Sequence, residues 1–201
     1  QLKPNDRSPE GVSFYDLSRN VIAREKAFYD GHAVAAVAAT TLEIAKRAAE
    51  LVEVDYEVLK PVMTIKDAVK KNAPILHKGM LTLNVEPKPT KSSNVASRTE
   101  FKLGDPSEAF NKADVVVERE YSTQTVHQGY IEPHACVASV AADGMVNIWC
   151  SSQGHFMVRS FVAKFCNMEA SRIKVIPAEI GGGFGGKTIV YLEPLAVMLA
   201  K

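Results

Sequence analysis

The densest glycine cluster of the chain lies near its C-terminus and reads Gly-Gly-Gly-Phe-Gly-Gly-Lys-Thr over residues 181–188. Glycine lacks a Cβ atom, so it adopts positive φ angles readily and lets the backbone approach another group closely. Five glycines in six positions predict a tight loop rather than a helix or a strand. The flanking sequence predicts a strand over 173–176 before this loop and a buried helix over 189–201 after it, with Pro194 in its first turns.

The loop also satisfies the phosphate-loop pattern G-x-x-x-x-G-K-[ST], which ends here in Lys187 and Thr188. In that interpretation Lys187 would reach the phosphates of ATP or GTP and the Thr188 hydroxyl would bind magnesium. However, only 13 residues follow Thr188, and an antiparallel hairpin precedes the loop in place of a parallel sheet. We therefore favour a bulky cofactor, with Phe184 packed against a flat ring. A nucleotide-binding module and a non-catalytic folded fragment stay open as alternatives.

Composition and charge exclude several classes of protein. The chain has 201 residues, of which 46% are hydrophobic, and a net charge of +1, which is typical of a globular protein that does not bind nucleic acid. Its longest nearly apolar run, over 33–39, is far shorter than the roughly 20 residues that span a membrane. Cys136, Cys150 and Cys166 form no Cys-x-x-Cys pair, so they favour a reducing, cytoplasmic setting over a disulfide framework or a zinc site.

The N-terminal part of the chain predicts a β-α-β unit. A short apolar run over 32–39 predicts a strand, and Thr-Thr-Leu-Glu at 40–43 has the spacing of a capping box that begins a helix. Apolar residues then recur every three or four positions, and 52–59 alternates like a half-buried strand. A shorter helix over 65–71 is expected to begin at Thr64.

The C-terminal part predicts a hairpin followed by a helix. Strands over 134–141 and 146–151 are joined by an Asp-Gly turn, and 153–167 carries apolar residues on one helical face. A further strand is expected over 115–121. Between the two parts, 78–106 is rich in Pro, Lys, Ser and Asn and is typical of a connector.

Three motifs that occur in order along the chain resemble the xanthine dehydrogenase and aldehyde oxidase family, the molybdenum hydroxylases. They are Tyr-Ile-Glu-Pro-His-Ala at 130–135, Ser-Ser-Gln-Gly-His-Phe at 151–156 and the glycine loop. Residues 26–37 and 51–59 resemble the hammerhead domain of that family, and 94–105 resembles the entry into its molybdenum-binding region. The resemblance therefore extends over essentially the whole chain.

The resemblance implies an α+β fold in three parts. These are a hammerhead-like α/β domain with a truncated N-terminus over 1–85, a connector over 86–107 and the first part of a molybdopterin-binding domain over 108–201. The chain begins with Gln1 rather than Met and ends at Lys201 inside a predicted helix. We therefore expect a central fragment of a longer molybdopterin-binding subunit.

The family also implies roles for individual residues. Gln153 is implied to donate a hydrogen bond to an oxo ligand of molybdenum, a task that suits a neutral amide. The backbone amides implied to approach the pterin belong to Gly182, Gly183, Phe184 and Gly185. No residue is implied to ligate the metal directly, and the catalytic base, a glutamate, is expected beyond Lys201. Glu132 and Lys187 are interpreted as structural residues.

Thr188 occupies the position where purine-oxidising members carry a glutamate. The implied substrate is therefore an aldehyde or another aromatic or heterocyclic compound rather than xanthine. The implied reaction is hydroxylation with oxygen from water at a molybdenum–molybdopterin cofactor, for which a cytosine dinucleotide form is one option. No cysteine pattern for iron–sulfur clusters is present, so these clusters and FAD are expected on partner subunits or segments, together with the remainder of the molybdenum subunit. The chain alone is expected to be inactive.

Overall fold

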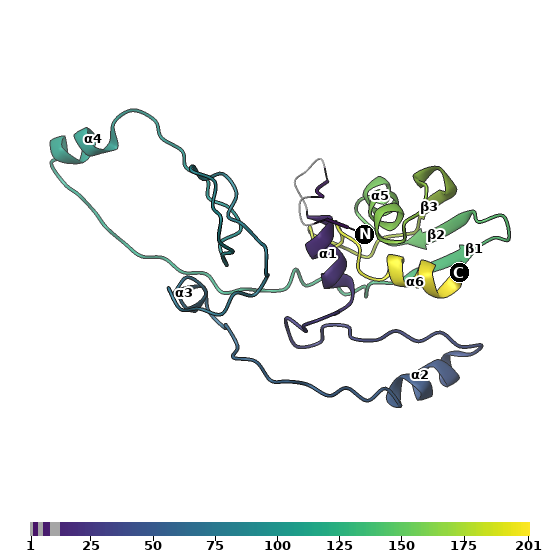
Figure 1. Cartoon of the computed structure of the whole chain (residues 1–201). Helices are drawn as coiled ribbons and strands as arrows, with labels where there is room; N and C mark the ends of the chain where they lie inside the picture. The colour runs from purple at the N-terminus through teal and green to yellow at the C-terminus, as the bar shows by residue number, and fades with distance from the viewer. Residues whose placement is uncertain (1, 4–5, 9–12) are drawn as a thin grey trace. The chain divides into compact units, whose positions relative to one another are not determined.

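The computed structural model describes residues 2–3, 6–8 and 13–201, so residues 1, 4–5 and 9–12 of the predicted first domain lie outside the described chain. The chain divides into two compact units (Figure 1). One comprises Gln1–Leu59 together with Gln128–Lys201, and the other comprises Lys60–His127. The α-helices and the small mixed sheet confirm the predicted α+β class.

The first unit contains a three-stranded sheet in the order β1-β2-β3. The strands are β1 (Cys136–Val140), β2 (Val146–Cys150) and β3 (Ile173–Pro177). β1 and β2 pair antiparallel with Cys136 opposite Cys150, while β2 and β3 run parallel with Val146 opposite Ile173. The predicted hairpin is confirmed: Gly144 adopts a φ of 84° in its turn, which an L-residue adopts only with strain.

Helices cover the buried face of this sheet. α5 (His155–Phe165) connects β2 to β3 and packs against β3, and α6 (Glu193–Ala200) packs against β1. The predicted helices are confirmed with shorter bounds, and Pro194 lies in the first turn of α6 as expected. α1 (Phe14–Val21), which sequence periodicity did not predict, begins at Ser13 and packs against α5.

The hydrophobic core of the first unit lies between these helices and the sheet. Phe161 is fully buried, and the ring of Phe14 meets it edge-on with 5.5 Å between the centroids. Burial of each large side chain of this kind stabilises the fold by roughly 1.5–3 kcal/mol. The other buried apolar residues are Leu17, Val21, Val146, Ile148, Cys150, Val158, Val162, Cys166, Ile173, Val190 and Val197.

The segment between α1 and residue 59 differs from the expected β-α-β unit. α2 (Leu42–Glu50) forms as predicted, and the Thr41 hydroxyl accepts a hydrogen bond of 3.2 Å from the Ile44 N–H. α2 buries none of its residues, however, and the strands predicted over 32–39 and 52–59 are wrong, since neither segment pairs with a strand of the described residues. Alternation of apolar residues describes one face of a strand, but a strand also needs a neighbouring strand to bond its backbone.

The second unit, Lys60–His127, consists mostly of irregular chain. α3 (Ile65–Ala68) begins at Thr64 as predicted but ends three residues early, and α4 (Pro106–Lys112) was not predicted. The strand expected over 115–121 is wrong, because that segment is exposed and pairs with no strand in the part of the chain that the structure describes. The Asn94 amide holds the unit together locally: its Oδ1 accepts from the Leu76 N–H at 2.9 Å, and its Nδ2 donates to two backbone carbonyls. Among the described residues, no helix is long and apolar enough to cross a membrane.

Candidate functional site

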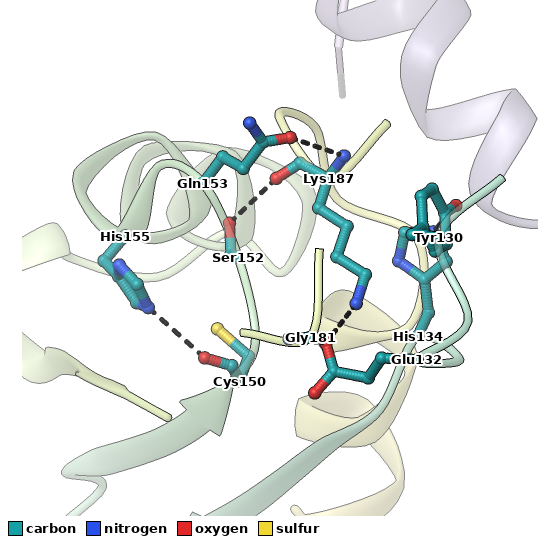
Figure 2. A network of polar contacts seen from close by, with 9 residues as sticks. All are labelled: Tyr130, Glu132, His134, Cys150, Ser152, Gln153, His155, Gly181 and Lys187. Carbon is teal, nitrogen blue, oxygen red and sulfur yellow. Dashed lines mark hydrogen bonds and ion pairs between the residues drawn. The ribbon is translucent and has the colours of Figure 1, made fainter. Parts of the chain in front are cut away.

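Three segments of the first unit meet at the end of the sheet where β2 and β3 finish (Figure 2). Residues 151–155 follow β2, the glycine loop 181–188 follows β3, and residues 130–134 precede β1. Parallel strands place their C-terminal ends at one edge, and the antiparallel pairing of Cys136 with Cys150 brings the start of β1 to the same edge. The topology thus brings together all three motifs that the sequence singled out.

Gln153 is bonded to the glycine loop through its side chain and its backbone. Its Oε1 accepts hydrogen bonds from the N–H groups of Gly185 at 3.0 Å and Lys187 at 3.2 Å. Its backbone N–H donates to the Lys187 carbonyl at 2.9 Å, to which the Ser152 hydroxyl also donates, at 3.2 Å. Both loop groups are N–H donors, so the end of the Gln153 carboxamide that faces them must be its oxygen and not its nitrogen. These bonds therefore fix the orientation of the carboxamide.

The Nε2 end of the Gln153 carboxamide therefore points away from the loop backbone (Figure 2). Within the described part of the chain, no group accepts a hydrogen bond from this Nε2. Gln153 as a whole is an exposed residue. An uncharged donor held in this way suits a hydrogen-bond acceptor outside the chain.

The loop is tight because of contacts on its inner side. A Cβ at Gly183 would lie 2.5 Å from Oε1 of Gln153, and one at Gly186 would lie 2.6 Å from Cε1 of Tyr130. At the tip, Gly185 has a φ of 87° and Phe184 a φ of 48°, the left-handed region that a bulky residue rarely enters. Phe184 is 73% exposed. The loop therefore buries its base and presents a strained, exposed aromatic tip.

Lys187 points away from this tip. Its side chain is 1% exposed, and its ammonium pairs with the carboxylate of Glu132 and lies 5.0 Å from the centroid of the Tyr130 ring. The Lys187 ammonium, together with the N–H of Gly181, holds the pKa of the Glu132 carboxyl below its ordinary value of 4.5. The sequence offered no signal for this ion pair, because its partners are 55 positions apart.

The same geometry overturns the phosphate-loop interpretation. A phosphate-loop lysine reaches into the loop, and the helix begins at the loop itself. Here Lys187 is turned to Glu132, α6 begins only at Glu193, and the Thr188 hydroxyl donates to the Gly185 carbonyl at 3.0 Å. The glycine loop therefore presents neither the cation nor the hydroxyl that a nucleotide and its magnesium ion would need.

Comparison with known proteins identifies the family. The family model described as the molybdopterin cofactor-binding domain matches residues 87–201, which is more than half of the chain. A second model, the a/b hammerhead domain of aldehyde oxidase and xanthine dehydrogenase, matches residues 4–60. The chain belongs to the xanthine dehydrogenase and aldehyde oxidase family. The resemblance carried by the three sequence motifs is thereby confirmed.

Individual members of the family resemble this chain over most of its length. The probable hypoxanthine oxidase XdhD of Escherichia coli O157:H7 is 33% identical over 81% of the chain. The large molybdopterin subunit of nicotinate dehydrogenase from Eubacterium barkeri is 31% identical over 78% of it. Among solved structures, quinoline 2-oxidoreductase of Pseudomonas putida 86 matches with a TM-score of 0.64 and 27% identity over 81% of the chain. The chain spans 20%, 34% and 19% of these three proteins, respectively.

The cofactor of the xanthine dehydrogenase and aldehyde oxidase family is molybdenum bound to molybdopterin, and the loop region fits such a group in two respects. Gly185 offers room, because nothing lies within 4 Å of the place where its Cβ would stand. Gln153 offers an uncharged donor whose orientation is fixed by the loop through Oε1. An open position on the loop backbone and a fixed donor therefore occur in the same loop region.

Proposed function

We propose that this chain supplies part of the molybdopterin site of an oxidoreductase that hydroxylates an aldehyde or an aromatic or heterocyclic compound with oxygen from water. The bound cofactor would supply the redox chemistry of that reaction. The chain would contribute Gln153 as a hydrogen-bond donor to the cofactor, and the close backbone of Gly182, Gly183, Phe184 and Gly185. The observation that carries this proposal is the fixed orientation of the Gln153 carboxamide, whose oxygen faces two loop N–H groups.

We propose an aldehyde or another aromatic or heterocyclic compound, rather than xanthine, as the substrate. Thr188 provides no carboxylate, and its hydroxyl is bonded to the Gly185 carbonyl. A substrate that needs a charged partner at this position would lose a strong hydrogen bond. The proposal is supported by relatives whose names specify quinoline and nicotinate, both of which are aromatic nitrogen heterocycles.

The remaining parts of the enzyme are proposed to lie outside this chain. They are a glutamate base beyond Lys201, the remainder of the molybdenum subunit, and iron–sulfur clusters and FAD on partner subunits or segments. The relative named a large molybdopterin subunit supports a division of this kind. We also propose a cytosine dinucleotide form of the cofactor, a cytoplasmic location and domain bounds of 1–85, 86–107 and 108–201. The match over 4–60 lies within the first of these domains, whereas the match over 87–201 includes the connector as well as the third.

The experiment replaces Gln153 by Glu in the assembled enzyme that contains this chain. A glutamate keeps an acceptor for the two loop N–H groups but removes the outward N–H donor. We expect turnover of an aldehyde or heterocycle to fall roughly 100-fold, the usual effect of losing one donor at a reacting group. Molybdenum and pterin contents would be measured on the same samples.

The matched control is Gln124→Glu, which makes the same chemical change at an exposed position of the second unit. We expect parental activity from this control and no turnover from the 201-residue chain alone. Full activity in Gln153→Glu, or a parent enzyme without molybdenum, would contradict the proposal.

A further inference from the structure

A single carboxylate touches both ends of the glycine loop. Oε2 of Glu132 accepts a hydrogen bond of 2.8 Å from the N–H of Gly181, the first residue of the loop. The same oxygen pairs with the ammonium of Lys187, which lies at the other end. Figure 2 shows the Glu132 carboxylate joined by a dashed line to the end of the Lys187 side chain, next to Gly181. The loop is therefore closed by one residue from a distant segment of the chain.

The two partners differ strongly in burial. The Lys187 side chain is 1% exposed, whereas that of Glu132 is 30% exposed. A buried ammonium without a partner is strongly destabilising, whereas a carboxylate that reaches solvent remains hydrated. Lys187 therefore depends on Glu132 more than Glu132 depends on Lys187. This distinguishes the pair from exposed ion pairs of the chain such as Lys112 with Glu108, whose side chains are 73% and 58% exposed.

The loop backbone also packs directly against the segment that carries Glu132. A Cβ at Gly181 would lie 2.7 Å from Cβ of Glu132, and the Gly186 position is equally close to Tyr130. The Lys187 backbone N–H, at the clamped end of the loop, is one of the two donors that orient Oε1 of Gln153. Any movement of the Lys187 end of the loop would therefore move the donor that faces the cofactor.

We propose that Glu132 and Lys187 form a clamp that fixes residues 181–187 and, through them, the Gln153 carboxamide. In this role, which rests on the proposed function, Glu132 is a positioning residue for molybdopterin and makes no contact with it. The clamp acts on the loop whether or not the cofactor is bound.

The test uses Glu132→Gln, Lys187→Met and the double variant. In the full chain, amide hydrogen exchange is measured for 181–187 and for β2 as an internal reference. We expect loop exchange to become roughly tenfold faster in all three variants while β2 is unchanged, as loss of a charged hydrogen bond implies. In the assembled enzyme we expect molybdopterin to dissociate roughly tenfold faster after dilution.

The double variant separates positioning from general stability. Glu132→Gln leaves the buried Lys187 ammonium without a counter-charge, so we expect the urea midpoint to fall most in this variant and to recover when Lys187→Met is added. If the pair only stabilises the fold, loop exchange and cofactor release in the double variant should slow again as the urea midpoint recovers. If the pair is a clamp, both should stay fast in the double variant even though the urea midpoint recovers. If Glu132→Gln does not fold, Lys187→Met and the double variant decide the question. The matched control is Glu108→Gln, which breaks an exposed ion pair and should change none of these quantities.

Unchanged loop exchange in Lys187→Met and in the double variant would overturn the clamp. Recovery of loop exchange and cofactor retention together with the urea midpoint would also overturn it. A parent enzyme without molybdopterin would contradict the proposed function instead, and the exchange measurement on the full chain would still decide on the clamp.

Discussion

A Cβ atom at Gly183 would lie 2.5 Å from Oε1 of Gln153. This separation is below any real contact, so Gly183→Ala must displace the Gln153 carboxamide from its two loop N–H donors. Gln153 is exposed, so water can replace part of the lost hydrogen bonding. We therefore expect the free energy of unfolding to fall by only about 1 kcal/mol. Urea unfolding followed by fluorescence of Trp149, the single tryptophan, measures this change. In the assembled enzyme, we expect this substitution to have a much larger effect on the cofactor content than on stability.

The comparison variant is Gly186→Ala, at a second buried position of the loop. Its Cβ would meet the Tyr130 ring at 2.6 Å, and a ring yields less than the end of a flexible side chain. Overpacking of this kind typically costs about 1–3 kcal/mol, so we expect Gly186→Ala to be the less stable variant. The reverse order would show that the Tyr130 ring moves more easily than the Gln153 side chain.

Phe184 has a φ of 48° and is 73% exposed, a combination that packing does not explain. Asparagine tolerates this backbone region, so we expect Phe184→Asn to leave the free energy of unfolding unchanged or to raise it by less than about 1 kcal/mol. If the ring contacts a flat substrate, KM should rise roughly tenfold in the assembled enzyme because an apolar contact is lost. Phe101→Asn, at a position that is 94% exposed, is the control. An unchanged KM would exclude this contact.

Stability should depend on pH through Glu132. The Lys187 ammonium and the Gly181 N–H hold the pKa of the carboxyl below its ordinary value of 4.5 in the folded chain. Its contribution is therefore complete above 4.5 and is lost as the pH falls through the lower folded value. Urea unfolding between pH 7 and pH 3 should show a steeper loss for the parent than for Glu132→Gln, which cannot titrate. Parallel curves would contradict this assignment.

The three thiols should react slowly in the folded chain. Burial raises the pKa of Cys136 to about 12 and those of Cys150 and Cys166 to about 11, against an ordinary value of 9.0. At pH 8 a rise of two units leaves roughly 100-fold less thiolate, and the thiolate is the reactive form. Iodoacetamide labelling followed by mass spectrometry should therefore be at least that much slower in buffer than in urea. Equal rates would show that these thiols are accessible.

Local signals in the sequence predicted local structure well. The Asp-Gly turn gave the correct hairpin, and a helix begins at Thr64 as expected. The helix expected from the capping box at 40–43 also forms, but its N-cap is Thr41 rather than the first threonine of that pattern. α4 also carried a signal that was not used, since Asp105 caps it ahead of Pro106 and Glu108. The predictions of strands over 32–39, 52–59 and 115–121 are wrong. A strand forms only beside a neighbouring strand, and the periodicity of a segment does not identify that neighbour.

The sequence motifs singled out residues that the structure brings together, but not the contacts between them. The motifs placed Gln153 and the loop in one region, and the topology of β2 and β3 brings them together. The bond from the Lys187 N–H to Gln153 spans 34 positions, and that from Lys187 to Glu132 spans 55. Contacts of this range depend on the whole fold, so no local pattern specifies which carboxylate meets the lysine.

The glycine loop is held at its base by Gln153 and Glu132 through bonds that need no ligand. Glycine-rich segments lose more conformational entropy on ordering than any others, and here folding itself imposes that loss. A cofactor that binds after folding would then not lose affinity to the ordering of these residues.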